Sequence, residues 1–375
     1  MSMLSRAGIA ILGAAMAAWT QTAPPLKINF AKDAPLAVVS AAPGESRSDA
    51  RGGAMVLDLH TALTLRNTSP LRVRGVTLLV ATQEFTPGGK GSVTVPSLDV
   101  PPGDTFPLRI DLRLLRPLMP GIGTMAEVTI DGVLFEDLSF YGPNKLNSRR
   151  QMTAWELEAR RDRRHLRSIL EAKGQEALRQ ELLSCLARLA DHPSLDVHLV
   201  RRGRATAMAA PEREVRFAFL RMPDSPVEPV SGLARVAGSE ARSPRIEVVN
   251  RSERPVRYFE IGWIIRDGTG REFLAGSVPA SEHGLALAPG ARGEVVQDAA
   301  LRFSSKARPI MIEAMTGFVS QVEFGDGSIW IPGRAALSQP HLNSVLAPSP
   351  EEQRLTDLYR RKGLTALIDE LKRFK

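Results

Sequence analysis

Side chains that could bind a metal ion gather at one place in the sequence, the stretch DHPSLDVH from Asp191 to His198. Aspartate and histidine are common zinc ligands, so this stretch raises the question of a metal site. The spacing fits no usual zinc motif, and the six histidines include no H-E-x-x-H pair. Pro193 also favours a linker at this point. The sequence therefore predicts no metal ion and no other cofactor.

Patterns of nucleophilic or nucleotide-binding chemistry are also missing. The chain has no G-x-S-x-G turn, no phosphate-binding loop and no G-x-G-x-x-G fingerprint. Cys185, the only cysteine, lies in ELLSCLARL on an apolar helical face with Leu178, Leu182 and Leu189, which predicts a buried structural thiol. No intrachain disulfide can form. We expect a protein that is not an enzyme; a hydrolase with an unrecognised inter-domain site is the catalytic alternative.

Two similar stretches of eleven residues lie 189 positions apart, VLFEDLSFYGP from Val133 and VEFGDGSIWIP from Val322, with five identities. At the same offset, the seventeen residues from Leu166 share seven identities with those from Leu355. Unrelated segments of ordinary composition match at roughly one position in fifteen. The sequence therefore predicts an internal duplication. Asp137 and Asp326, which recur in these stretches, are more typical of turns than of catalysis.

The part of each copy that precedes these stretches has the pattern of β-strands. Apolar residues alternate with polar ones in VLDLHTALTLRN and in FPLRIDLRL, which predicts antiparallel sheets with one packed face. Asp267-Gly268 indicates a hairpin turn, and Asp326-Gly327 another. Leu138 replaces the glycine of that second turn in the first copy, so we expect the two turns to differ, because a positive φ strains leucine. Strands at this spacing indicate a β-sandwich.

The period becomes helical after each predicted sandwich. Ser349-Pro350-Glu351-Glu352 is a helix start, and Lys173-Gly174 and Lys362-Gly363 each end one helix before another begins. We therefore predict a mainly β fold with helices, in which two tandem sandwiches are each followed by a short helical hairpin. The predicted segments are a signal peptide over 1–23 with cleavage near Ala17, a sandwich over 24–146, a hairpin over 147–192, a linker over 193–213, a second sandwich over 214–346 and a second hairpin over 347–375.

These motifs give the chain a resemblance to a known class of proteins. The Asn-x-Ser turn before a strand, the Pro-Gly turn and the V-x-F-x-D-x-S-x-aromatic pattern resemble secreted bacterial proteins built from tandem immunoglobulin-like or fibronectin-III-like sandwiches. The immunoglobulin cysteine pair is absent. The resemblance implies a fold and not an activity.

The N-terminus and the net charge bear on location and partners. Arg6 precedes an apolar run of twelve residues, Ala7 to Ala18, which is typical of a cleaved secretory signal peptide and too short to span a bilayer. The sequence thus predicts a periplasmic or cell-surface protein. The formal net charge of +8 favours anionic partners without naming one.

The two copies differ most in charge at the start of their helices. Arg160 to Arg164 carries a net charge of +3, whereas the matching Ser349 to Gln353 carries −2. We interpret this as tolerance of either charge by the fold, so that the arginines are free to serve as a contact site. The apolar stripe of this helix is Met152, Trp155, Ala159, Leu166 and Ile169. The candidate partner-binding residues are Trp155, Arg160, Arg161, Arg163 and Arg164.

The sequence favours a non-catalytic binding or scaffolding protein of a bacterial cell envelope, with another envelope protein or an acidic surface as its partner. An alternative is peripheral association with an anionic membrane through the basic helix over 148–172. A second alternative is a solvated helix that packs its stripe on its own sandwich. Nucleic acid is not expected as a partner, because a secreted protein does not meet it.

Overall fold

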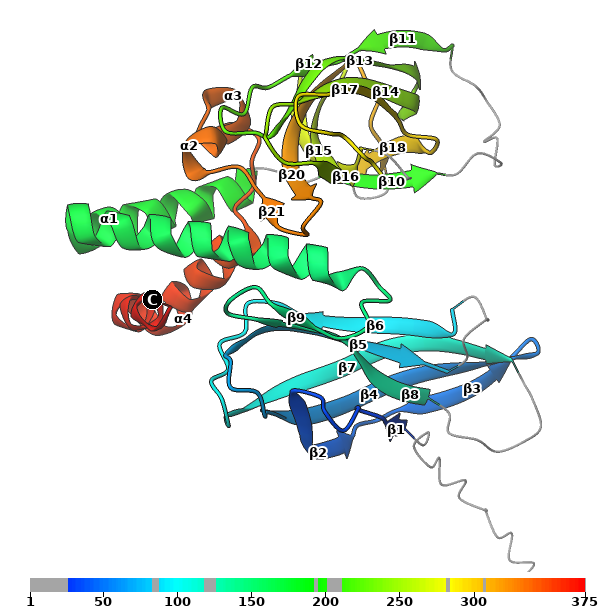
Figure 1. Ribbon diagram of the computed structural model, residues 1–375, viewed down its shortest axis with the longest axis vertical. Coiled ribbons are helices and arrows are strands. Elements are labelled where there is room, and N and C mark those ends of the chain that lie inside the picture. Colours follow the sequence, from blue (N-terminus) through cyan, green and yellow to red (C-terminus); the bar gives the residue numbers. More distant parts are fainter. Residues whose placement is uncertain are drawn as a thin grey trace, which may run out of the picture. The chain divides into compact units, whose positions relative to one another are not determined.

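The computed structural model describes residues 26–82, 88–117, 126–191, 195–200, 211–280, 284–305 and 308–374. The predicted signal peptide and most of the predicted linker lie outside these ranges. The described chain is mainly β and forms several sheets (Figure 1). Its helices, within the described ranges, include none that is both long enough and apolar enough to cross a membrane.

The chain divides into two compact units. Unit 1 contains the described residues up to Arg72 together with Thr77–Val95 and Val100–Asp131. Unit 2 contains two short segments, Val73–Val76 and Pro96–Asp99, and the described residues from Gly132 onward. Unit 2 therefore holds all the described helices and every described strand that begins after Gly132.

A long antiparallel pair dominates unit 1. β4 and β7 pair in register from Ala54 opposite Pro117 to Arg66 opposite Thr105. Every second residue of β4 from Leu57 to Leu65 is buried, and all of these are leucines except Thr61, as the alternating pattern predicts. The strands of this sheet are β2 (Leu36–Pro43), β3 (Arg47–Arg51), β4 (Ala54–Asn67) and β7 (Thr105–Pro117), with β2 and β3 both pairing with β4.

A second sheet begins in unit 1 and has the order β1-β8-β5-β6. Its first pair, β1 with β8, is parallel, and the short β9 extends β8 on the side that belongs to unit 2. The strands are β1 (Leu26–Ile28), β5 (Val73–Ala81), β6 (Lys90–Val95), β8 (Ala126–Phe135) and β9 (Phe140–Tyr141).

Two sheets of unit 2 enclose one hydrophobic core and give a sandwich-like arrangement. One sheet has the order β10-β18-β14-β13-β11, with β17 on β14 and β19 on β18; the other has the order β12-β20-β15-β16, with β21 on β20. The core between them contains Val248 and Phe303 from the first sheet and Trp263 and Val322 from the second. The bounds are β10 (Asp196–Val200), β11 (Arg213–Arg216), β12 (Ala218–Phe219), β13 (Val227–Ala237), β14 (Glu240–Asn250), β15 (Val256–Arg266), β16 (Glu272–Pro279), β17 (Arg292–Val296), β18 (Ala300–Ser305), β19 (Arg308–Pro309), β20 (Ala314–Phe324) and β21 (Ile329–Trp330).

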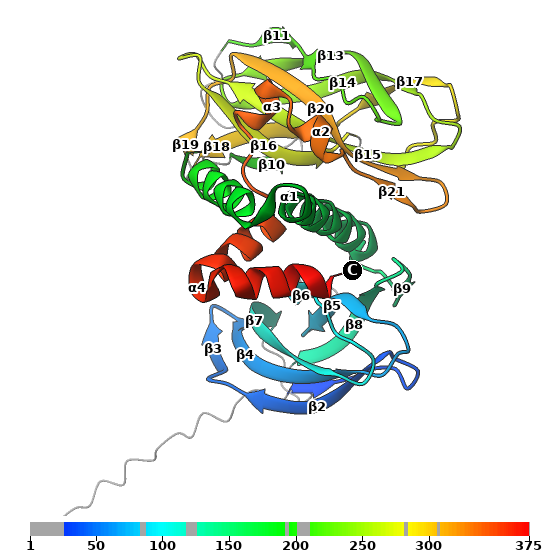
Figure 2. The same ribbon diagram turned by 90° about the vertical axis from the view of Figure 1, so that its left-hand side faces the viewer.

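The helices of unit 2 are α1 (Ser148–Asp191), α2 (Arg334–Leu337), α3 (Pro340–Asn343) and α4 (Pro350–Arg373). α1 and α4 are each interrupted at the predicted glycine, since Gly174 and Gly363 have φ values of 82° and 80°. A capping box at Ser349 and Glu352 starts α4, as predicted. The two helices pack on each other (Figure 2), and the leucines between them are Leu166, Leu178, Leu182, Leu355, Leu367 and Leu371. These form three pairs at the offset of 189.

The aspartate turns differ in part from their prediction. Leu138 and Gly327 both have a positive φ, 67° and 83°, so the expected difference between the two turns is wrong. Asp137 makes this possible, because its carboxylate accepts a hydrogen bond from the backbone N–H of Ser139 and fixes the turn. In the β15–β16 hairpin the positive φ belongs to Gly270 and not to Gly268.

One asparagine turn recurs with the same hydrogen bonds in both parts of the chain. Asn67 donates to the carbonyls of Leu71 and Val100, and its oxygen accepts from Ser69. Asn250 donates to the carbonyls of Arg254 and Leu287, and its oxygen accepts from Ser252, in the same sequence order. Both asparagines are fully buried, and their hydrogen bonds connect each turn to a second loop.

Candidate functional site

The predicted contact residues of α1 do not form one exposed patch. Arg164 is exposed, Trp155, Arg160 and Arg161 are half-buried, and Arg163 is only 3% exposed. Arg161 binds Asp162 at 2.9 Å and donates to the carbonyl of Pro332. Among the four arginines, Arg164 alone lacks a carboxylate partner within the described residues. Its guanidinium only donates to the carbonyl of Arg160.

Arg163 joins α1 to α4. Its guanidinium lies 3.1 Å from Glu156 on α1 and 3.2 Å from Glu351 on α4. Arg160 also binds Glu156, at 2.8 Å, and Arg354 also binds Glu351, at 2.8 Å. Arg74 also lies 3.8 Å from Glu156, so Glu156 is shared among three guanidiniums and Glu351 between two, which compensates the loss of water on burial.

Phe374 lies at the centre of this ion network. The guanidinium carbons of Arg74, Arg163 and Arg354 lie 5.1, 4.0 and 5.6 Å from the centroid of its ring. Arg167 donates to the carbonyl of Phe374. Cation–π contacts and hydrogen bonds therefore fix the last described residue within unit 2. The arginines of this network act inside the protein, which is a use that the sequence interpretation did not foresee.

The apolar stripe of α1 is largely covered by the protein itself. Met152, Ala159 and Leu166 are at most 1% exposed, and Trp155 and Ile169 are half-buried. A helix that lies in a membrane interface must present its apolar face to lipid. In this structure those three side chains are not available for such insertion.

Cys185, Glu181 and Glu352 place a sulfur and two carboxylate oxygens within 4.8 Å of one another. Two arginines already neutralise this cluster, because Arg334 binds both carboxylates, at 2.7 Å to Glu352 and 3.2 Å to Glu181, and Arg188 binds Glu352. A divalent cation would have to displace both guanidiniums, so the cluster does not fit a metal site.

The Cys185 thiol is free and buried, as predicted. Burial and the nearby Glu352 raise its pKa to about 11, so it is not a nucleophile at neutral pH. Its surroundings are more polar than the sequence indicates. Leu189, expected on the same buried face, is 44% exposed.

Glu158 has a raised pKa, which is a property that a general acid or base requires. Burial, followed by the charges of Asp162 and Glu260, raises the pKa of Glu158 to about 7, against the opposing effect of Arg161. Tyr258 donates to Glu260 at 2.6 Å, and burial and Glu260 raise the pKa of that phenol. Within the described ranges, Glu158 forms no hydrogen bond with a nucleophilic side chain, so it does not define a reaction.

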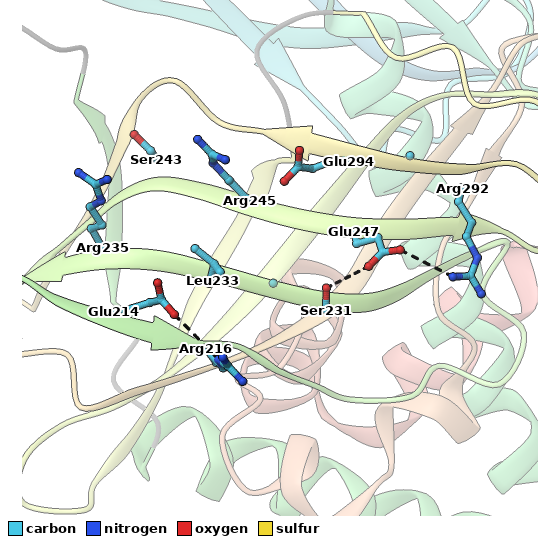
Figure 3. A pocket seen from close by; sticks show the side chains of 12 residues that line it. Glu214, Arg216, Ser231, Leu233, Arg235, Ser243, Arg245, Glu247, Arg292 and Glu294 are labelled. Atoms are coloured by element: carbon cyan, nitrogen blue, oxygen red, sulfur yellow. Dashed lines mark hydrogen bonds and ion pairs between the residues drawn. The ribbon is translucent and has the colours of Figure 1, made fainter.

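Unit 2 has a hollow on the outer face of the sheet formed by β11, β13, β14 and β17 (Figure 3). We call it the charged hollow. Its volume is about 980 Å³. It is lined by Glu214, Arg216, Ser231, Gly232, Leu233, Arg235, Ser243, Arg245, Glu247, Arg292, Gly293 and Glu294. Strand alternation explains it, because Ala234, Val236, Ile246 and Val248 face the core and their neighbours therefore face outward.

The charges of the hollow are separated along the strands. Arg216 and Arg245 are the cross-strand neighbours of Leu233 on either side, and Arg235 is two residues farther along β13 (Figure 3). Toward the other end, Glu247 stands directly opposite Glu294. Three cations and Glu214, which stands opposite Arg235, thus surround one half-buried leucine, while two carboxylates face each other farther along the sheet.

Few of these charges are strongly paired. Within the described residues, the side chains of Arg235 and Arg245 form no ion pair and no hydrogen bond, and both are exposed. Arg216 and Glu214 are 3.9 Å apart but 88% and 59% exposed, so their pairing is weak. Glu247 accepts a hydrogen bond from Ser231 and lies 3.8 Å from Arg292. The hollow therefore presents charged groups with unused binding capacity.

Two other openings differ from it. A hollow of about 570 Å³ in unit 1, lined by residues of β2, β3, β4 and β7, has its charges paired locally, for example His60 with Asp111 at 2.8 Å. A groove of about 590 Å³ beside β12 is lined mainly by apolar side chains, including Phe217, Met222 and Val230. Neither contains a pair of free arginines comparable to Arg235 and Arg245.

The sequence interpretation did not find the charged hollow. The stretch ARVAGSEARSPRIEV contains Arg235, Arg245 and Glu247 at alternating positions, but this pattern is typical of any solvent-exposed sheet face. The missing information is the register, which places Leu233 opposite Arg245 and Ser231 opposite Glu247. The available signal was the presence of outward-facing charges on adjacent predicted strands.

No protein-family model matches the sequence, and no curated protein sequence matches it. Among solved structures, red sea bream transglutaminase aligns at 9% identity with a TM-score of 0.13, over 80% of this chain and 31% of that one. The chain therefore spans about a third of that protein's length. A structure titled pT26-6p aligns at 8% identity with a TM-score of 0.14, over 88% of this chain and 73% of that one. Likenesses this weak carry no argument about fold or function.

Proposed function

We infer that the protein is a non-catalytic binding or scaffolding protein of a bacterial cell envelope, and that the charged hollow is its contact surface. The N-terminal pattern of Arg6 followed by an apolar run supports secretion. The presence of only one cysteine means that stability comes from cores and ion networks.

An internal duplication underlies the proposed architecture. Each copy would be an immunoglobulin-like or fibronectin-III-like sandwich followed by a helical hairpin. The support is the recurrence of the Asn67 turn at Asn250, of the Gly174 break at Gly363, and of three leucine pairs at one offset. In this proposal, the helical ends of the two copies diverged in charge and now bind each other, as Arg163 does with Glu351.

The observation that carries the binding function is the pair Arg235 and Arg245. They are exposed, lie on adjacent strands of an open hollow, and have no partner among the described residues. Free cations on a rigid sheet can bind a partner's anionic groups without first breaking internal ion pairs. By contrast, the α1 arginines are mostly engaged inside the protein, which makes the hollow the better supported contact surface.

Affinity capture from the native envelope tests this function. The tagged mature protein would be compared with Arg235→Glu/Arg245→Glu and with Arg164→Glu, a charge reversal on the exposed part of α1. We expect a partner that the first variant loses and the second retains. A partner retained by the hollow variant and lost by Arg164→Glu would place the contact on α1. The absence of any partner for the wild-type protein would contradict the binding function.

A further inference from the structure

The two ends of the charged hollow differ in the sign of their net charge, because three arginines and Glu214 give +2 at one end, and Glu247, Glu294 and Arg292 give −1 at the other. This restricts what can occupy it. Arg216, Arg235 and Arg245 stand around Leu233 at one end. Glu247 and Glu294 stand opposite each other toward the other end, where Arg292 lies 3.8 Å from Glu247. Figure 3 shows Arg216, Arg235 and Arg245 toward one end of this sheet face, with Glu214 beside Arg216, and Glu247 beside Arg292 toward the other end.

A ligand of uniform negative charge would fit only half of this face. Nucleic acid, polyphosphate or an anionic membrane would bind the three arginines but would also meet the two carboxylates. Like charges that lie directly opposite each other destabilise a sheet face, and Glu247 and Glu294 already do so in the free protein. A positive group on the ligand would relieve that repulsion, whereas a further negative group would increase it.

An uncharged carbohydrate would also bind poorly in the hollow. Sugars stack on aromatic rings, and the residues that line the hollow include no phenylalanine, tyrosine or tryptophan. Leu233 offers a small apolar contact between the arginines instead. This combination suits an aliphatic chain that carries both carboxylates and amines.

We propose that the charged hollow binds a polypeptide segment of a partner protein in which acidic residues precede or follow basic ones. The acidic part binds Arg216, Arg235 and Arg245, with an aliphatic stem against Leu233. The basic part binds Glu247 and Glu294. This proposal rests on the proposed function, because it names the partner chemistry of the same surface.

The exposure of these groups sets the expected strength of binding. Each exposed ion pair contributes about two- to fivefold in affinity, so the segment binds weakly, and its affinity falls as salt rises. Reversing two charges removes two attractions and adds two repulsions. We therefore expect each double reversal to weaken binding at least tenfold.

Fluorescence anisotropy with synthetic probes tests the proposal on the full chain. One probe has a block of glutamates joined to a block of lysines, a second has glutamates only, and the third is labelled polyphosphate. The variants are Arg235→Glu/Arg245→Glu and Glu247→Lys/Glu294→Lys. Arg47→Glu/Arg109→Glu, in the hollow of unit 1, is the matched control, because both of its arginines are exposed too.

The mixed-charge probe should bind the wild-type protein best at about 50 mM salt, and both hollow variants should lose at least tenfold in affinity. The glutamate probe should gain affinity for Glu247→Lys/Glu294→Lys. The control should change either affinity by less than twofold. Circular dichroism spectra that match the wild type show that the variants fold.

Each contrary outcome has a distinct meaning. Absence of binding by the mixed-charge probe overturns the proposal. The wild type could instead bind polyphosphate or the glutamate probe more tightly than the mixed-charge probe, and lose this binding in Arg235→Glu/Arg245→Glu. That result overturns the peptide proposal and leaves the binding function intact. Self-association of the wild type that this variant abolishes identifies a second copy as the occupant and also overturns it. Failure of every probe, together with the capture of no envelope partner by the wild-type protein, contradicts the binding function as well.

Discussion

Arg163 provides the sharpest test of whether the α1 arginines build the fold or serve a partner. It is 3% exposed, binds Glu156 and Glu351, and stacks on Phe374. Replacing it with alanine removes all three contacts at once. Arg164→Ala, on the next residue, removes an exposed side chain of the same type and is the matched control.

The loss of unfolding free energy in Arg163→Ala depends on which ion pairs remain in the variant. Breaking a buried ion pair by removing one partner costs about 3–5 kcal/mol, because a charge is left buried and unpaired. Here Glu156 keeps Arg160, and Glu351 keeps Arg354. We therefore expect Arg163→Ala to lower the free energy of unfolding by about 3 kcal/mol, at the low end of that range. Arg164→Ala should change it by less than about 0.5 kcal/mol.

Tryptophan fluorescence during urea unfolding measures this difference. The tryptophans of the described residues, Trp155, Trp263 and Trp330, all belong to unit 2, so the signal follows the unit that contains the network. A double-mutant cycle with Glu351→Ala isolates the Arg163–Glu351 contact and should give a coupling of about 1–3 kcal/mol. If Arg163→Ala and Arg164→Ala have the same midpoint, the network does not stabilise unit 2 and the reasoning is refuted.

Three further predictions concern single residues. The pKa of Glu158 is about 7 in the folded protein and has an ordinary value of 4.5, so its contribution to stability is complete below pH 4.5 and is lost as pH rises through 7. In urea unfolding, the free energy of unfolding of the wild type should fall by about 2–3 kcal/mol between pH 4.5 and 8 relative to that of Glu158→Gln. Equal pH profiles of the two proteins would contradict this. Leu138→Gly should raise the free energy of unfolding by up to about 1 kcal/mol and Gly327→Leu should lower it by about 1–2 kcal/mol, since both positions have a positive φ; thermal scans that show the opposite order would contradict the shared turn. Cys185 should resist alkylation by iodoacetamide at pH 8 until urea unfolds the protein, because its pKa is about 11 and it is buried; rapid alkylation of the native protein, followed by mass spectrometry, would contradict the assigned burial.

Local patterns in the sequence predicted the elements well where one residue decides the geometry. The alternation from Leu57 to Leu65 gave the strand and its buried face, and Gly174 and Gly363 gave the helix breaks. The strand alternation and the helix breaks depend on residues close together in the chain, so they can be predicted from the sequence. The prediction for the turn at Leu138 was wrong because the hydrogen bonds of Asp137 stabilise a positive φ that leucine alone disfavours.

The candidate sites could not be predicted as well, because they depend on contacts between distant residues. The opposite charges of Arg160–Arg164 and Ser349–Gln353 were visible at the offset of 189, and we interpreted them as tolerance of either charge. The structure instead brings Arg163 to Glu351, which makes the difference in charge part of the packing. The charged hollow likewise requires the register of β13 and β14, which no local pattern of the sequence specifies.

Site-specific photo-crosslinking in cells identifies which surface of the protein contacts the partner. A photoreactive residue would replace Leu233, at the centre of the charged hollow, or Arg164, on the exposed part of α1, and the cells would be irradiated. A partner protein crosslinked from position 233 and not from position 164 is the result that the proposed contact surface predicts. A partner crosslinked from position 164 alone would contradict it and return the contact to the helix.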